Sequence, residues 1–340
     1  MRAGELSWLG AVLVPLGCAG VLAAGCSSHG GGGAPSGDAG GDTAASTLDG
    51  GDDSGDEAEA TAPQTQLRMA HTSPDAPPLD LCVAPHGTSS FQGPLLAQLA
   101  LGGGAGDAGD ADIETDAAVP GVAYAQVSAY VALAPGPYDV RIVAAGASSC
   151  DSAIAAGGDA AGPVADWTNL PPLALNTSAT LLLAGDLRPA GDDGRLTVTL
   201  LTDDSALSTG AAVLRAINAI PSERSLDFGL GSGSAWEPLL TDVTFGAASA
   251  TTGPGQGTVD ANGYTPIPPL SSQAVSARPS SSDAGADIAV AMNVEIAQGS
   301  IATILAIGGK TGDSAHPPAL LLCEDNQPSG GLLSDCSVAH

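Results

Sequence analysis

Residues 67–83, LRMAHTSPDAPPLDLCV, decide how the chain is interpreted, because residues 214–230, LRAINAIPSERSLDFGL, repeat their pattern. Each copy begins with Leu-Arg in a short apolar run, passes through a proline-containing centre, and continues with a second apolar run that begins with Leu-Asp. The Leu-Arg and Leu-Asp pairs are 12 residues apart in both copies. Apolar runs joined by a turn-rich centre predict a strand, a turn and a second strand.

Further matches follow in the same order and extend the repeat to residues 66–206 and 212–338. They are Pro94-Leu95-Leu96 with Pro238-Leu239-Leu240; Tyr124, Val127 and Tyr130 with Tyr264, Ile267 and Leu270; Ala179-Thr180 with Ala302-Thr303; and Leu201, Asp203 and Asp204 with Leu322, Glu324 and Asp325. Only a few residues join the two copies, which favours a docked pair over two freely swinging domains.

The remaining sequence indicates an all-β protein. The clearest alternation of apolar and other residues runs from 288 to 296, and long helical periodicity is absent. Aromatic residues make up 3% of the chain, so the core must consist mainly of Ala, Val, Leu and Ile. We predict two tandem β-sandwich domains, immunoglobulin-like or transthyretin-like, after a signal peptide and a disordered tether.

The first copy resembles the family called domain of unknown function 4397. Residues 67–83, with the core Arg-x-x-His-x-Ser-Pro-Asp-Ala-Pro, resemble its opening, and residues 131–140, VALAPGPYDV, resemble its later strand, turn and strand. The resemblance implies a β-sandwich of the kind found in secreted and surface proteins, and it implies no known reaction. The second copy departs from the pattern, with Asn218 in place of His71 and Ser271-Ser272 in place of the Pro-Gly turn.

The N-terminal region resembles that of a bacterial lipoprotein. Residues 1–25 form an apolar run after Arg2 that fits a signal peptide, and Leu22-Ala23-Ala24-Gly25 before Cys26 resembles a lipobox. Lipidation of Cys26 would anchor the protein to a membrane; a retained transmembrane helix is the alternative. Residues 26–65 then form a Gly-, Ser- and Asp-rich acidic tether without Lys or Arg, which we expect to be disordered.

The formal net charge of −28 argues against nucleic-acid binding, because binding to phosphates needs Lys and Arg side chains. The expected partners are the membrane, through the lipid anchor, and an unidentified protein or glycan ligand. The expected location is the cell envelope, at the outer membrane on its periplasmic or surface face.

Four cysteines remain after Cys18 is removed with the signal peptide and Cys26 is lipidated. An even number in an exported chain predicts two disulfides, and three pairings are possible. Pairing within each copy, Cys82 with Cys150 and Cys323 with Cys336, avoids contact across the joint between the copies and is the pairing we predict.

His71, Ser73, Asp75 and Asp80 lie close together and resemble the components of a catalytic triad. However, no Gly-x-Ser-x-Gly surrounds Ser73, and Pro74 lacks the N–H that would commonly serve as an oxyanion donor. We therefore predict no enzyme. The hydrolase hypothesis, with His71 and nearby carboxylates, stays open as an alternative. Structurally, Asp75 is expected to cap a turn, and Asp80 to pair with Arg68 or Arg215 or to accept backbone N–H bonds.

No cofactor or metal is expected. An acidic loop could make the chain a calcium-dependent adhesion module, but its spacing does not match a calcium-loop pattern; its residues are Asp107, Asp110, Asp112, Glu114 and Asp116. Residues 308–311 resemble a phosphate loop only superficially and predict a hairpin turn, and the His and Cys spacing fits no zinc site. The sequence thus predicts a lipid-anchored envelope protein with a binding or structural surface role.

Overall fold

The computed structural model describes residues 64–97, 121–151, 166–189, 194–203, 210–280, 286–309, 315–325 and 336–339. These residues all belong to one compact unit, 60–340, and the unit formed by residues 1–59 lies outside them. The described chain is nearly all β, as predicted, with one short 3-10 helix, η1 (Gly233–Ala235). Within the described ranges, no helix is long and apolar enough to cross a membrane.

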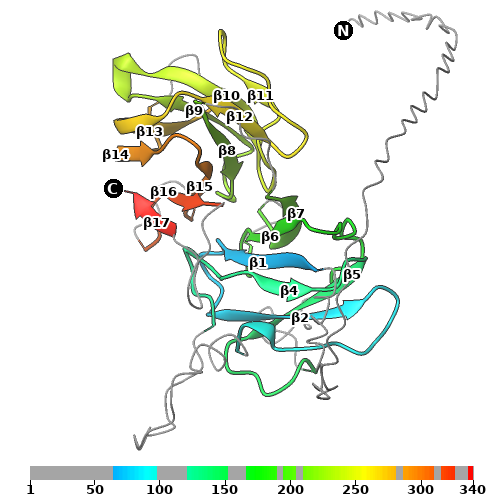
Figure 1. The fold of residues 1–340 in the computed structure, drawn as a ribbon. Coiled ribbons are helices and arrows are strands. Elements are labelled where there is room, and N and C mark those ends of the chain that lie inside the picture. The colour runs from blue at the N-terminus through cyan, green and yellow to red at the C-terminus, as the bar shows by residue number, and fades with distance from the viewer. Residues whose placement is uncertain are drawn as a thin grey trace, which may run out of the picture. The chain divides into compact units, whose positions relative to one another are not determined.

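The first half of the described chain, residues 64–203, contains two sheets (Figure 1). The outer sheet pairs β2 (Leu79–Pro85) with β5 (Tyr138–Ala144). The inner sheet has the order β3-β1-β6-β7, with β4 also paired to β1; its strands are β1 (Thr65–His71), β3 (Gln126–Val127), β4 (Val131–Leu133), β6 (Ser178–Ala184) and β7 (Thr197–Thr202). Strand β1 starts at Thr65, the last residue that the sequence assigned to the tether.

The second half, residues 210–339, also contains an inner and an outer sheet. The inner sheet, ordered β12-β8-β15-β16-β17, contains β8 (Ala212–Asn218), β12 (Tyr264–Ile267), β15 (Ile301–Ile307), β16 (Ala319–Glu324) and β17 (Cys336–Ala339). The outer sheet, ordered β11-β10-β9-β13-β14, contains β9 (Ser225–Leu230), β10 (Glu237–Thr244), β11 (Thr251–Thr252), β13 (Leu270–Pro279) and β14 (Ala289–Ile296).

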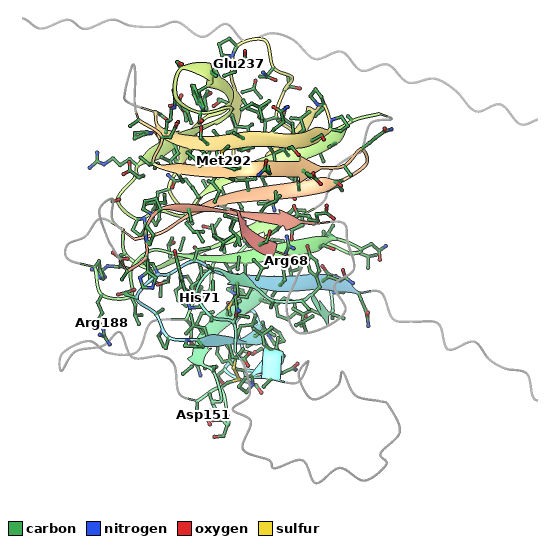
Figure 2. The ribbon with its side chains drawn as sticks, turned by 90° about the vertical axis from the view of Figure 1, so that its left-hand side faces the viewer. Arg68, His71, Asp151, Arg188, Glu237 and Met292 are labelled. Atoms are coloured by element: carbon green, nitrogen blue, oxygen red, sulfur yellow. A yellow bond between two sulfur atoms is a disulfide. The ribbon has the colours of Figure 1, made fainter. Side chains whose placement is uncertain are left out.

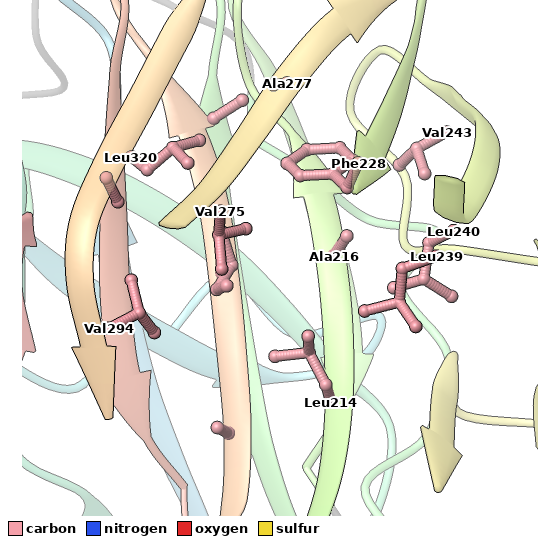
Figure 3. Packing of buried hydrophobic residues seen from close by; sticks show 14 of the residues in the cluster. Leu214, Ala216, Phe228, Leu239, Leu240, Val243, Val275, Ala277, Val294 and Leu320 are labelled. Carbon is pink, nitrogen blue, oxygen red and sulfur yellow. The ribbon is translucent and has the colours of Figure 1, made fainter. Parts of the chain in front are cut away.

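The four sheets stack as layers, with the two inner sheets facing each other in the middle (Figure 2). Three apolar clusters fill the three spaces between layers. The largest lies between the inner and outer sheets of the second half, where Leu214 of β8 packs near Phe228 of β9 and Val275 of β13 (Figure 3). Because each inner sheet is covered on both faces, β8 and β15 are buried along their whole length.

The inner sheets of the two halves have the same arrangement. In the first half, β1 pairs in parallel with β6, with Leu67 opposite Ala179. In the second half, β8 pairs in parallel with β15, with Leu214 opposite Ala302. The two parallel pairs therefore have equivalent registers, and the order of matches seen in the sequence corresponds to a real structural correspondence in these strands.

Two details of the sequence alignment are wrong. Tyr264 is equivalent to Tyr130, whereas the comparison of the two copies matches it with Tyr124. The pairing of β1 with β4 puts Tyr130 beside Arg68, and Tyr264 lies opposite Arg215 in the pairing of β12 with β8. Likewise, Asp325 corresponds to Asp203 rather than to Asp204. The backbone N–H of Asp203 donates to the carbonyl oxygen of Ser178, and that of Asp325 donates to the carbonyl oxygen of Ile301. Ser178 and Ile301 are equivalent, because each directly precedes the alanine that lies opposite the leucine of the Leu-Arg pair. Similarity of residue type had placed both matches in the wrong register.

The predicted disulfides Cys82–Cys150 and Cys323–Cys336 are both present. The first joins β2 to the segment after β5. The second joins neighbouring strands, because Cys336 lies directly opposite Cys323 in the pairing of β16 with β17. As expected, the second disulfide attaches the C-terminal strand to the edge of the inner sheet.

Candidate functional site

The most concentrated group of polar side chains lies between the two inner sheets. Successive side chains of a strand point to opposite faces, so Leu67 and Met69 of β1 enter the first-half core while Arg68 points toward the second half. In β8, Leu214 likewise enters the second-half core and Arg215 points toward the first half. Both arginines are almost completely buried, at 2% and 0% exposure.

In the first half, three side chains surround Arg68. Its Nε donates a hydrogen bond to Thr180 Oγ1 at 2.8 Å, and that hydroxyl donates to Asp203 Oδ2 at 2.5 Å. Tyr130 OH donates to the same carboxylate oxygen at 2.9 Å, and the guanidinium lies 4.8 Å from the Tyr130 ring centroid.

The second half repeats this set. Arg215 Nε donates to Thr303 Oγ1 at 3.0 Å, and Thr303 donates to Asp325 Oδ2 at 2.5 Å. Tyr264 OH donates to Asp325 Oδ2 at 2.7 Å, and its ring centroid lies 4.5 Å from the guanidinium carbon. We call these eight residues the central polar cluster: Arg68, Tyr130, Thr180 and Asp203 with Arg215, Tyr264, Thr303 and Asp325.

Each arginine also reaches the aspartate of the other half. Arg215 Nη2 donates to Asp203 Oδ1 at 2.6 Å, and Arg68 Nη2 donates to Asp325 Oδ1. Apolar residues of both halves surround these ion pairs and seal them from solvent, among them Leu182 of β6 and Leu305 of β15. The cluster therefore joins the halves through two reciprocal, buried, charge-assisted hydrogen bonds.

The charges of the cluster compensate one another. Burial alone would lower the pKa of Arg68, but Asp325 and Asp203 raise it above its ordinary value. Burial would raise the pKa of Asp203, but Arg215 and Arg68 lower it. Both arginines and Asp203 thus remain charged over the ordinary pH range, and neither carboxylate nor guanidinium is accessible to a substrate.

One donor distinguishes the two arginines. Arg215 Nη1 donates to the carbonyl oxygen of Thr202 at 2.8 Å, whereas the buried Arg68 Nη1 has no hydrogen-bond partner. Beside Thr202, a cavity of about 370 Å³ is lined by residues 200–202, 248–250 and 260–263. Its lining is mostly small side chains and backbone, and it contains none of the catalytic or metal-binding candidates of the sequence analysis.

His71 is part of the fold and is sealed from solvent, at 0% exposure. The backbone N–H of Ser73 donates to its Nδ1 at 3.3 Å, so Nδ1 is unprotonated and Nε2–H donates to Pro77 O at 3.0 Å. Burial lowers the pKa of His71 to about 4. A neutral imidazole that makes two hydrogen bonds and has no access to solvent cannot act as a general base. The hydrolase hypothesis therefore loses its base.

Asn218 replaces His71 in the second half and also braces the turn that follows its strand. Its Oδ1 accepts from the backbone N–H of Ile220 at 3.1 Å, and its Nδ2 donates to the carbonyl oxygen of Glu223 at 2.8 Å. The exchange of His for Asn between the two copies therefore preserves a turn brace.

The carboxylates near His71 also brace the backbone. Asp75 accepts from the backbone N–H groups of Leu187 and Arg188, at 2.6 and 2.8 Å. Asp80 accepts from three backbone N–H groups, those of Leu81, Leu96 and Ala97. Its predicted backbone bonds are thus confirmed, and its predicted pairing with an arginine is wrong, because both arginines point to the opposite face of the inner sheet.

Other predicted sites lie outside the described residues, namely the lipidation site Cys26, the acidic loop at 107–116, and Lys310 with Thr311 of the phosphate-like loop. In the part of the chain that is described, no three His, Cys, Asp or Glu side chains are grouped closely enough to hold a metal ion.

The sequence did not reveal the central polar cluster as a site. It identified both arginines as repeated, but the acidic partner that it considered for them was Asp80, as one of two alternatives for that residue. The usable signal was an arginine inside an otherwise apolar strand in both copies, together with the repeated Thr180 and Thr303. A buried charge without a partner is costly, so two arginines in buried strands indicate that acidic partners lie elsewhere in the chain.

Comparison with known proteins gives little functional information. No curated protein matches the chain. A crystal structure of a proposed cell adhesion protein from Bacteroides uniformis aligns with 82% of this chain and 97% of its own, at 8% sequence identity and a TM-score of 0.13.

The family model described as Domain of unknown function (DUF4397) matches residues 97–229. The match begins after residues 67–83, includes residues 131–140, and continues through β8 into β9. It therefore contains one of the two segments that carry the resemblance, together with the joint between the halves. A second, divergent domain of this family stays a prediction. Residues 97–229 are thus similar to the family described as Domain of unknown function (DUF4397).

Proposed function

We propose that this protein is a lipid-anchored component of the cell envelope that displays two joined β-sandwiches in a binding or structural role, without catalysis. The observation that carries the proposal is the burial of the central polar cluster. The residues best suited to chemistry, Arg68, Arg215, Asp203 and Asp325, are used to join the two halves and are closed to solvent.

Other features support an exported, structural role. Two disulfides fit an oxidising compartment, since they are rare in proteins of the cytosol. The acidic tether before β1 would hold the stacked sheets away from the membrane, and its charge would keep it extended. The ligand would then be a protein or glycan that contacts the outer surface of the stack.

The experiment compares the wild-type chain with Cys26→Ser in a bacterial host, by cell fractionation and by detergent phase partitioning. We expect the wild type in the envelope fraction and the detergent phase, and the variant as an uncleaved precursor or a soluble protein. Protease treatment of intact cells then reports on which face the chain is displayed. A variant that still enters the detergent phase after removal of the signal peptide would refute lipidation at Cys26.

A further inference from the structure

The interface between the two inner sheets is built the same way from both sides. Arg68 of the first half pairs with Asp325 of the second, and the equivalent Arg215 of the second half pairs with Asp203 of the first. Both pairs are hydrogen-bonded across the interface. The supporting contacts to a threonine and a tyrosine repeat as well. This reciprocity is the defining property of an isologous interface, the kind that joins two identical copies in a symmetric dimer.

Separating the halves would be costly, because it would expose one face of each inner sheet. The first half would expose Ala70, Leu182 and a charged Arg68 that now lie at 0 to 2% exposure. The second half would expose Ile217, Leu305 and Arg215 in the same way. A surface of this composition needs a partner with a complementary one.

A second copy of the chain carries such a surface. Only residues 204–211, between Asp203 and β8, join the halves directly. The contacts of the cluster would be the same whether the facing half belonged to the same chain or to another. We propose that the two halves can be exchanged between chains, so that the first half of each chain docks on the second half of its partner in a reciprocal dimer.

The apolar residues around the cluster determine which halves pair. The equivalent positions Ala70 and Ile217 differ in size, and so do Ala184 and Ile307. Pairing a first half with a second half brings two alanines and two isoleucines into one apolar cluster. Pairing two first halves would leave space, and two second halves would be overpacked, and both errors cost stability. The charged centre is therefore self-complementary, while the apolar surround favours unlike halves.

Chain concentration decides between the closed monomer and the exchanged dimer. A joint of this length holds the halves at a high effective concentration, so the closed monomer dominates in dilute solution. The dimer gains when the joint is strained or when chains are crowded. If the lipid anchor of the proposed function is correct, chains would be crowded on a membrane, but the exchange itself does not depend on the anchor.

The test uses charge reversal in the full chain. One variant reverses the first half, Arg68→Asp with Asp203→Arg, and the other reverses the second half, Arg215→Asp with Asp325→Arg. Each keeps an opposite pair within its reversed half but places like charges across its own interface. In a mixture of the two variants, the reversed first half of one chain has charges complementary to the reversed second half of the other. The unchanged second half and the unchanged first half are complementary as in the wild type. A chain with all four substitutions restores both pairs internally and is the matched control.

We expect each variant alone to have a lowered melting midpoint, and the control to be a monomer with a midpoint near that of the wild type. After the two variants are denatured and refolded together, we expect a one-to-one dimer of twice the chain mass, with the midpoint recovered. Light scattering and native mass spectrometry measure both properties. A mixture without such a dimer, beside a control that folds, would overturn the proposal.

If the control chain does not fold, the wild type decides the matter. It is held just below its melting midpoint at high concentration and then cooled. We expect a dimer that returns to monomer on dilution and heating and keeps both disulfides within each chain. Monomer alone, or precipitate without a soluble dimer, would show that the halves do not exchange.

Discussion

The inner sheets of the two halves are alike, whereas their outer sheets differ. Both inner sheets contain a parallel pair in equivalent register and contribute the same four residues to the central polar cluster. Among the described residues, the outer sheet of the first half has two strands, and that of the second half has five. The inner sheets face each other, so a change in one must fit the other, while the outer sheets have freedom to diverge.

The outward faces of the outer sheets are covered by different means. In the first half, the Cys82–Cys150 disulfide lies there with Phe91, over which Arg141 stacks at 4.0 Å. In the second half, Trp236 covers β9, and Arg278 stacks over it at 4.4 Å. Each arginine also pairs with an aspartate. A disulfide in the first half and a tryptophan ring in the second half thus each cover the outward face of an outer sheet.

The largest effect should come from breaking the central polar cluster. Arg215→Met leaves the carboxylate of Asp203 without its cross-interface donor, and removing one member of a buried ion pair costs about 3–5 kcal/mol. Arg68→Met should cost less, because Arg68 Nη1 has no partner to lose. Urea unfolding of both variants measures the difference. Equal losses would show that the hydrogen bond from Arg215 to Thr202 contributes nothing.

The disulfides should rank next, and the first-half disulfide should contribute more. Cys82–Cys150 closes a separation of 68 residues and Cys323–Cys336 one of 13. On the chain-entropy model, replacing each pair by alanine costs about 4 and about 3 kcal/mol. Thermal and urea unfolding of the two double variants test the ranking. A larger loss for Cys323 with Cys336 would mean that attaching β17 matters more than loop entropy.

A pH dependence should separate His71 from its counterpart Asn218. The pKa of His71 is about 4 in the folded protein and near 6.5 when unfolded, so the unfolded chain binds the extra proton first. Stability is therefore complete above pH 6.5 and is lost as pH falls toward 4, by on the order of 3 kcal/mol. His71→Asn should keep the turn brace and flatten this part of the profile. Urea unfolding from pH 7.5 to 4.0 checks it; an unchanged profile would assign the dependence to other groups.

The sequence predicted the strands well because they depend on local patterns. The alternation at 288–296 corresponds to β14, and both Leu-Arg runs are inner strands. It predicted the disulfides because few pairings were possible. It could not pair Arg68 with Asp325, which is 257 residues away, because only the docking of the two halves brings them together. Insertions of different length before Tyr130 and Tyr264 likewise hid their equivalence.

The smallest effect concerns the position at which the outer sheets diverge, Cys82 in the first half and Gly229 in the second. A Cβ at Gly229 would meet the Trp236 ring and the backbone oxygen of Glu237, and the backbone cannot move aside as a side chain can. Gly229→Ala should therefore destabilise the protein by about 1–3 kcal/mol, the usual cost of overpacking. Adding Trp236→Ala removes the ring but not the backbone oxygen. If the double variant recovers most of the loss of stability, the Trp236 ring is the obstacle. The ring would then pack as closely on the second-half outer sheet as the disulfide does on the first-half outer sheet. If the double variant is less stable still, the strand spacing between β9 and β10 requires glycine by itself. Thermal unfolding of the single and the double variant beside the wild type distinguishes these outcomes, and a Gly229→Ala chain as stable as the wild type would contradict both.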